Sequence, residues 1–440
     1  MFETLKKAFK VKEIRGKIFF TLLIILVYRI GCYIPVPGIG GGLISQADLS
    51  NVSYLNIMSM MTGGALSNGT WFAMGIGPYI NASIIIQLLS VAIPALERLT
   101  RMGEEGQKKI AKYTRLGAVI LAVVQSIGIL VNYAPALLAD PTSSASNAVK
   151  FLFNQRWLFY TLCVIFYASG ALATVWLGER ITDYGVSNGI SLLIFVGVLS
   201  TAGQAVLSMI TNTFTGGGNL VYFWKLIGYI LVIIVVFAGI VFVDLAERKV
   251  PVQYAKRVQG RKMYGGQTTV IPMKINASGV MPLIFSFSIL SFPEMIATMF
   301  WPNSKFVIWW QRWMGTNSWL YMVVLCLLIL GFAYFYASIQ FKPEEISRSI
   351  QQNGGNIVGI RPGKPTTEYL TRIHRRITLF GAIFLAITAL IPAFLFRLID
   401  AGNSSIFSAT GLLICVSIAL EFNNALESQI MMKQYKGFLK

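Results

Sequence analysis

Apolar stretches of about 20 residues recur along the whole 440-residue chain and alternate with polar, basic segments. The hydrocarbon core of a bilayer is about 30 Å thick, so each spanning helix needs roughly 20 apolar residues. Only 12% of the residues are charged, against about 25% in soluble domains, which argues against a water-soluble fold. The sequence therefore predicts an all-α membrane protein with ten transmembrane helices, at 18–34, 71–93, 116–133, 157–177, 189–210, 226–244, 275–299, 319–341, 377–396 and 405–422.

Lysine and arginine are divided unequally between the two sides of these predicted spans. Of the 37 basic residues, 30 fall on the side that holds both chain termini and six on the opposite side. Because basic residues concentrate on the cytoplasmic side of membrane proteins, we expect both termini to be cytoplasmic. Two cytoplasmic loops, 245–274 and 342–376, are basic and longer than a helix connection requires, so they are predicted to be docking surfaces.

The chain carries few of the residues that metal or catalytic chemistry requires. Its four cysteines, Cys32, Cys163, Cys326 and Cys415, lie far apart, and its single histidine is His374. This spacing does not indicate a disulfide, a metal cluster or a Ser-His pair. The sequence also lacks a Gly-x-x-x-x-Gly-Lys-Ser/Thr phosphate-binding loop, so driving energy would come from a partner. We expect no enzyme activity, no metal and no cofactor.

Ten spans form two sets of five, and because five is odd the second set enters the membrane with the opposite polarity. This arithmetic predicts an inverted repeat, with an amino-terminal half at 1–210 and a carboxy-terminal half at 211–440. In such folds, Gly- or Pro-interrupted spans at matching positions mark the working site. Spans two and seven fit, since each combines these residues with an Ile-Asn-Ala-Ser string, at 80–83 and 275–278. Ordinary kinks, with Asn joining neighbouring helices, are the alternative.

Several short strings along the chain carry a family resemblance. They are Gly-Ala-Leu at 64–66, Phe-Ala-Met-Gly-Ile-Gly-Pro-Tyr-Ile at 72–80, Ser-Ile-Ile-Ile-Gln-Leu-Leu at 83–89, Ser-Asn-Gly-Ile-Ser at 187–191, Tyr-Ala-Lys-Arg at 254–257 with Gln-Gly-Arg at 259–261, and Gly-Ile-Arg-Pro-Gly at 359–363. In this order they resemble the SecY family, the channel-forming subunits of the bacterial Sec protein translocase. The resemblance implies two five-helix halves in a clamshell around a central pore. It also implies a channel that passes unfolded preproteins across the membrane and releases membrane helices laterally into lipid.

The same resemblance assigns side chains to three parts of the channel. A ring of apolar side chains at the waist of the pore would consist of Ile76, Ile80, Ile190, Ile194, Ile284 and Ile414. A lateral gate between spans two and seven would carry Asn81, Gln87 and Asn276, with Gln87 and Asn276 facing each other across the seam. The external segment at about 52–70 would be a plug under the ring, containing Leu55, Met58, Met61, Gly63 and Gly64. The two glycines are expected to end its short helix.

The resemblance also implies partners. Four cations in the long cytoplasmic loops would dock the motor ATPase SecA or the ribosome: Lys256, Arg257, Arg261 and Arg361. Binding of these cations to anionic lipid is the alternative. SecE and SecG would complete a heterotrimer, signal sequences and nascent chains would enter the channel, and membrane lipid would border it. SecDF and YidC are further candidate partners, and the expected location is the bacterial cytoplasmic membrane.

Two other functions stay open at this point. A secondary transporter can also contain inverted repeats with broken helices. Against it, the carboxylates Asp244, Glu294 and Glu421 are predicted to lie near span ends rather than at midplane. An accessory SecY-like paralogue for dedicated substrates is the closer alternative. Arg29 is the basic residue within the first span, and we expect it to have a structural partner there.

Overall fold

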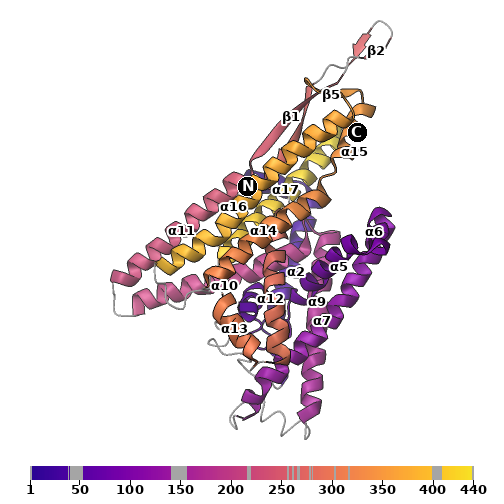
Figure 1. The fold of residues 1–440 in the computed structure, drawn as a ribbon. Coiled ribbons are helices and arrows are strands. Elements are labelled where there is room, and N and C mark those ends of the chain that lie inside the picture. Colours follow the sequence, from indigo (N-terminus) through magenta and orange to yellow (C-terminus); the bar gives the residue numbers. More distant parts are fainter. Residues whose placement is uncertain are drawn as a thin grey trace. The chain divides into compact units, whose positions relative to one another are not determined.

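Long helices dominate the structure (Figure 1). The computed structural model describes residues 2–37, 39, 53–139, 156–215, 220–254, 257–259, 262–264, 268–276, 279, 281–301, 304–315, 318–398 and 409–438. Each predicted span overlaps a helix. In chain order these are α2 (Lys12–Gly31), α5 (Gly77–Ala92), α7 (Glu104–Ala139), α9 (Arg156–Tyr184), α10 (Gly189–Thr215), α11 (Leu220–Asp244), α12 (Met281–Phe300), α14 (Trp319–Gln340), α16 (Lys364–Leu398) and α17 (Ala409–Phe438).

Several of these helices have the length and composition of membrane spans. Among the described residues, five stretches qualify: Glu104–Tyr133, Trp157–Tyr184, Met281–Phe300, Trp319–Gln352 and Lys364–Ile391. A sixth results if Gly77–Ala92 and Pro94–Thr100, which meet at 105°, form one broken span. The second part of that pair belongs to α6 (Pro94–Arg101). The chain is therefore a multi-pass membrane protein.

The chain folds into two compact units. The first comprises Met1–Leu226, Ser288–Tyr321 and Ala401–Lys440, and the second comprises Ile227–Phe287 and Met322–Asp400. Helices α12 and α14 each begin in one unit and end in the other.

In the first unit, α7 packs against both α5 and α9 around a buried apolar core. Its most buried large side chains include Leu66, Leu130, Phe159 and Tyr167. Lipid tails are as apolar as these side chains, so association of the helices gains little from leaving lipid. Dispersion contacts and close fit therefore carry the packing.

Glycines let backbones approach closely in this unit. A Cβ on Gly170 of α9 would overlap the carbonyl oxygen of Trp71, and a Cβ on Gly189 of α10 would overlap that of Gly178. Small residues at such contacts are typical of helix packing in membranes. The close approaches make these positions intolerant of larger residues.

We expect Gly170→Ala to lower the thermal unfolding midpoint of the purified protein, because overpacking costs about 1–3 kcal/mol. The matched control is Gly331→Ala in α14, where an added Cβ meets no atom of the described residues within 4 Å. At that position, alanine should leave the thermal unfolding midpoint unchanged or raise it, since glycine inside a helix lowers stability by roughly 0.5–1 kcal/mol relative to alanine. Equal midpoints for the two variants in detergent would show that the Trp71 contact is not tight.

The two ends of the chain meet in the first unit. Helix α1 (Phe2–Lys10) contacts α17, and the Thr4 hydroxyl donates to Glu427 Oε1 at 3.1 Å. A small buried cluster joins these elements to the start of α2 and the loop before α10: Ala8, Ile14, Ile18, Val186, Leu426 and Ile430. The amino-terminal and carboxy-terminal helices therefore lie at the same end of this unit.

The second unit carries a small sheet that the all-α prediction left out. Strand β1 (Glu247–Tyr254) pairs antiparallel with β4 (Thr268–Lys274) on one side and β5 (Gly355–Ile357) on the other. Val250 and Val252 of β1 are buried with Ile357 of β5 and Leu370 of α16. A separate hairpin, β2 (Arg257–Gln259) with β3 (Lys262–Tyr264), lies between β1 and β4 in the chain. The two long basic loops are therefore joined into one structure, since β1 comes from the first and β5 from the second.

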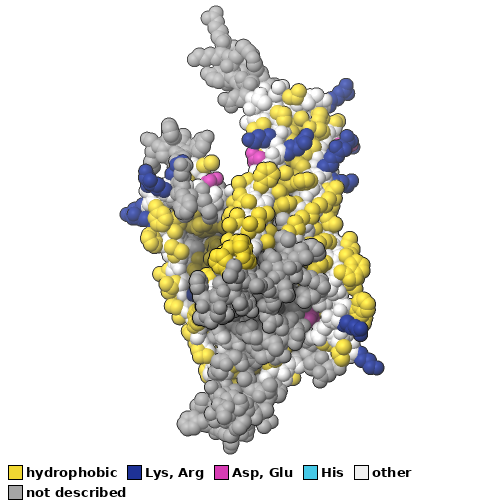
Figure 2. Space-filling view, turned by 90° about the vertical axis from the view of Figure 1, so that its left-hand side faces the viewer, with side chains coloured by type: hydrophobic (Ala, Val, Ile, Leu, Met, Phe, Trp, Pro, Cys, Tyr) yellow, Lys and Arg dark blue, Asp and Glu magenta, His cyan; other side chains and the backbone are white. Residues whose placement is uncertain are grey.

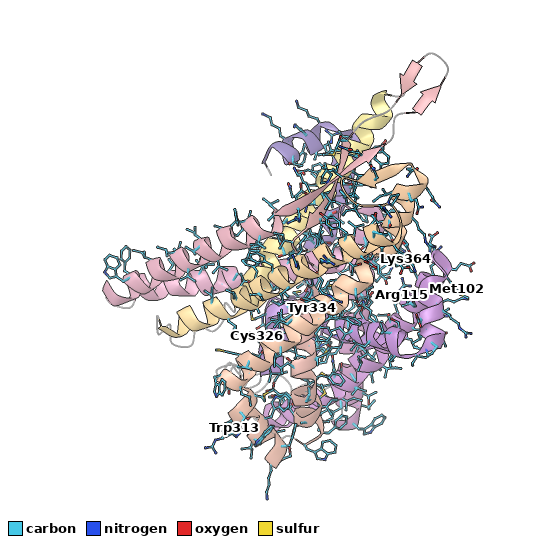
Figure 3. All side chains as sticks on the ribbon, turned by 45° about the horizontal axis from the view of Figure 1, so that its top comes forward. Met102, Arg115, Trp313, Cys326, Tyr334 and Lys364 are labelled. Carbon is cyan, nitrogen blue, oxygen red and sulfur yellow. The ribbon has the colours of Figure 1, made fainter. Side chains whose placement is uncertain are left out.

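A short aromatic helix, α13 (Lys305–Met314), was not predicted and follows α12 in the first unit. The Ser304 hydroxyl caps it by accepting from the Val307 amide at 3.3 Å. Phe306, Ile308, Trp309 and Trp313 are exposed, and Figure 3 labels Trp313. Figure 2 shows hydrophobic side chains over much of the described surface, with lysine and arginine in separate patches. Exposed tryptophans at helix ends are typical of the membrane–water interface.

Candidate functional site

The segment predicted to be a plug contains a short helix, α4 (Ser53–Met61). Leu55 and Met58 are 4% and 3% exposed and belong to the core of the first unit, whereas Met61 is half-buried. Gly63 and Gly64 follow with φ angles of 67° and 84°, a left-handed conformation that glycine adopts without strain. The prediction that these glycines end the helix is confirmed.

Helix α4 lies directly against α10. A Cβ on Gly197 of α10 would overlap the carbonyl oxygen of Met61, so the end of α4 touches the α10 backbone. The Thr62 hydroxyl donates to the carbonyl oxygens of Met58 and Ser59 at 3.0 and 3.1 Å, which satisfies two of the last carbonyls of the helix. Helix α4 is therefore packed against α10, in its seat, and its carboxy-terminal end is capped.

The six isoleucines predicted to form a ring are distributed over both units. In the first unit, Ile76 caps the start of α5 and Ile80 follows in its first turn, and both are buried. Ile194 on α10 and Ile414 on α17 are also buried, and these two helices pack together. Ile190 at the start of α10 is half-buried. Ile284 is buried on α12, in the second unit.

The breakers predicted inside spans two and seven are at helix starts. Gly75 has a φ of 50°, Pro78 lies in the first turn of α5, and Pro282 is the second residue of α12. Proline is favoured in a first turn because its missing N–H would have no partner there. The Thr174 hydroxyl of α9 donates to the Gly75 carbonyl at 3.0 Å, which ties this start to the core.

The three predicted gate amides lie in different surroundings. Asn81 is buried on α5, and Gln87 Nε2 on the same helix donates to Ser83 Oγ at 3.1 Å. Asn276 lies in a turn after β4, outside α12, which begins at Met281 rather than at 275. Its Nδ2 donates to Asp244 Oδ1 at 2.6 Å, and its Oδ1 is buried without a hydrogen-bond partner in the part of the chain that the structure describes. The structure therefore provides a strong polar partner for Asn276 within the second unit.

Of the four predicted docking cations, Arg361 is described with its side chain. It is exposed in the turn between β5 and α16, where Gly359 and Gly363 have φ angles of 79° and 101°. The Thr366 hydroxyl donates to the Arg361 carbonyl at 2.9 Å, and the Ser347 hydroxyl donates to the Gly363 carbonyl at 3.0 Å. The turn is thus held from both sides. Arg257 is the first residue of β2, whereas Lys256 and Arg261 lie outside the described residues.

Three polar residues in the first unit were not assigned roles by sequence reasoning. Asn132 of α7 donates through Nδ2 to the carbonyls of Gly128, Thr298 and Met299, at 2.8, 2.9 and 3.3 Å, joining α7 to the end of α12. Glu294 is 3% exposed and lies in the carboxy-terminal part of α12, after Pro293. Arg29, whose expected partner was unspecified, donates through Nη2 to Ser200 Oγ of α10. A polar residue inside an apolar run is the signal common to all three.

The described residues contain no group of three or more His, Cys, Asp or Glu side chains that could hold a metal ion. The four cysteines are free thiols, two buried and two half-buried. The first unit has a buried apolar core against which α4 packs, and the second unit has an exposed arginine, Arg361, on a hydrogen-bonded turn.

Comparisons with known proteins point in one direction. The SecY family model matches residues 70–423. A protein translocase subunit SecY from Halalkalibacterium halodurans is 38% identical over 447 residues, covering 100% of both chains. One from Corynebacterium glutamicum is 39% identical, covering 99% of each.

Solved structures with the same fold are more distant in sequence. One described as "The structure of a protein conducting channel" has a TM-score of 0.62 and 19% identity, covering 94% of this chain and 91% of that one. Another, "Sec61 in the Canine ribosome-channel complex from the endoplasmic reticulum", has a TM-score of 0.60 and 18% identity, with coverages of 94% and 91%.

Proposed function

The chain belongs to the SecY family, and from this we propose that it is the channel subunit through which unfolded preproteins cross the membrane and membrane helices enter lipid. The observation that carries the proposal is identity of 38% to a translocase subunit SecY along the full length of both chains. The shared fold with a protein-conducting channel supports it.

The proposed architecture has ten spans in two inverted five-helix halves, 1–210 and 211–440, arranged as a clamshell. Helices at all ten predicted positions support it. The six isoleucines would surround the waist of the pore, where a narrow apolar collar excludes water by dewetting. Helix α4 would seal the pore from the outside, and its seat against Gly197 supports this role.

The proposed lateral gate opens between α5 and α12. Its seam carries Asn81, Gln87 and Asn276, and a signal sequence would compete with their polar contacts as it enters. The hydrogen bond from Asn276 to Asp244 is a further polar contact beside the proposed gate. A hydrogen bond to a charged group contributes about 1.5–3 kcal/mol, so the turn before α12 is held more firmly than an amide pair would hold it.

The proposed partners are SecA and the ribosome on the cytoplasmic face, and SecE and SecG in the membrane, with SecDF and YidC as further candidates. Basic residues Lys256, Arg257, Arg261 and Arg361 would dock the first two. The exposure of Arg361 on a braced turn supports this. Both termini would lie in the cytoplasm of a bacterial cell, in keeping with the contact between α1 and α17. The full-length match favours neither an accessory paralogue nor a transporter.

The test is reconstitution of the purified chain, with a SecE-like partner, into vesicles that receive an exportable precursor, SecA and ATP outside. We expect protease-protected precursor that depends on ATP. Vesicles without the chain are the control for adsorption. Absence of protection, together with saturable uptake of a small solute, would contradict the channel and favour a transporter.

A further inference from the structure

Arg29 connects three elements of the first unit at one point. It lies in the last turn of α2, and its Nη2 donates to Ser200 Oγ on α10. Its Cζ lies over the Tyr33 ring, 5.9 Å from the ring centre, a cation–π contact. The guanidinium is therefore fixed in place between two helices.

The second terminal nitrogen of this guanidinium, Nη1, faces the end of α4. A Cβ built on Gly63 would lie 2.5 Å from Arg29 Nη1, and 3.3 Å from the Gly197 carbonyl oxygen. The backbone at 61–63 is thus wedged between α10 on one side and the Arg29 side chain on the other. Only glycine fits at position 63, both for space and for its φ of 67°.

The charge of Arg29 suits this place. The carboxy-terminal end of a helix carries partial negative charge, and a nearby cation stabilises it. Arg29 lies beside the residue that follows α4 by two positions, so its charge acts on the last turn of that helix. The contact with α4 is therefore attractive although it includes no carboxylate.

The contact is also incomplete. Nη1 is buried and has no hydrogen-bond partner among the described residues. A buried donor without a partner is costly, and water would satisfy it as soon as α4 moved away. The Arg29 charge therefore stabilises the contact with α4, whereas its unsatisfied Nη1 reduces that stabilisation.

We propose that Arg29 is the positioning residue that holds α4 in its seat and sets how readily it leaves. This rests on the proposed function, in which α4 closes the resting pore. The immediate consequence is that α4 responds to changes at Arg29 and at Gly63 as one unit, because both changes act on the same contact.

The test measures exposure of α4 directly. A cysteine at Ser59 on α4, with the four native cysteines replaced by serine or alanine, is labelled by a membrane-impermeant maleimide in the reconstituted protein. We expect Arg29→Gln to raise the labelling rate by about tenfold or more, and Ser200→Ala to raise it less, because water and Tyr33 can still hold the cation. Arg15→Gln, an exposed arginine on the same helix, is the matched control.

The double variant gives the sharper result. Gly63→Ala alone should raise the rate, since its Cβ meets Arg29 Nη1. Adding Arg29→Gln to Gly63→Ala should change the rate by much less than Arg29→Gln does alone. Unchanged labelling in Arg29→Gln and Ser200→Ala, or equal effects from Arg15→Gln, would overturn the inference. If labelling is unaltered in a variant that still translocates precursor, the inference about Arg29 is refuted and the proposed channel is not. If the unmodified chain does not translocate precursor, the proposed channel is refuted.

Discussion

Replacing Ile80 and Ile194 together by serine is expected to make the resting channel leak ions. Both side chains are buried, at 8% and 3% exposure, on α5 and α10 of the first unit. A narrow apolar constriction excludes water and ions only while its surface is apolar, so hydroxyl groups would allow it to wet. We expect the resting ion permeability of vesicles to rise by about tenfold or more, measured with a potential-sensitive dye.

The control is serine at Ile85, on the same helix but on its exposed face. It makes the same chemical change away from the proposed ring, and the resting permeability should stay at the wild-type value. Translocation by the double variant should persist, since a wetted ring still passes an unfolded chain. Equal leaks from the ring variant and the Ile85 variant would remove these isoleucines from the pore.

Reversing the charge of Arg361 to glutamate is expected to reduce SecA-driven translocation by about tenfold or more, because a like charge would face acidic groups of the docked partner. The side chain is exposed, so the fold should tolerate the change. The turn that presents it is braced by Thr366 and Ser347, which limits the ability of the loop to move the new charge away. The measurement is the initial rate of precursor protection at several SecA concentrations.

Arg348→Glu is the matched control for Arg361. Arg348 is an exposed cation of the same loop, on α15 (Pro343–Gln352), outside the Gly-Ile-Arg-Pro-Gly turn. A general electrostatic attraction to the loop would make both reversals equally harmful, and would contradict a specific role for Arg361. If docking is specific, high SecA concentrations should partly restore the Arg361→Glu rate, and added salt should slow the variant less than the unmodified chain, because screening weakens an attraction but relieves a repulsion.

The positions of the helices could be read from the sequence, because spanning a bilayer needs an apolar run of defined length. Helix starts could not, and the seventh span shows why. No charged residue lies between Lys274, the end of β4, and Met281, the first residue of α12, so hydropathy placed the start of the span at 275, six residues too early. The boundary is set by Pro282, which favours a first turn, and by the Asp244 bond that draws Asn276 out of the helix.

The small sheet was missed although its signal was present. Val250 and Val252 alternate with exposed residues in β1, the period of a half-buried strand. The basic residues around them made the segment resemble a solvated loop. The partner strand β5 lies about 100 residues later, and no local pattern can indicate a pairing at that separation.

Within the candidate site, the sequence predicted the short helix and its glycine end, because those depend on local chemistry. It could not predict that Arg29 reaches Gly63, since this contact joins residues of α2, α4 and α10. The buried position of Glu294 was missed for the same reason. Polar residues in apolar runs point to a partner, and only the fold identifies which one.

The aromatic helix α13 has a consequence for how this protein can be observed. Five of the nine tryptophans in the whole chain lie in or near that helix: Trp301, Trp309, Trp310, Trp313 and Trp319. The ultraviolet emission of the unlabelled chain is therefore weighted toward one short region between α12 and α14. A change of solvent around that region should shift the emission wavelength of the whole protein, so an ordinary fluorescence spectrum becomes a local probe.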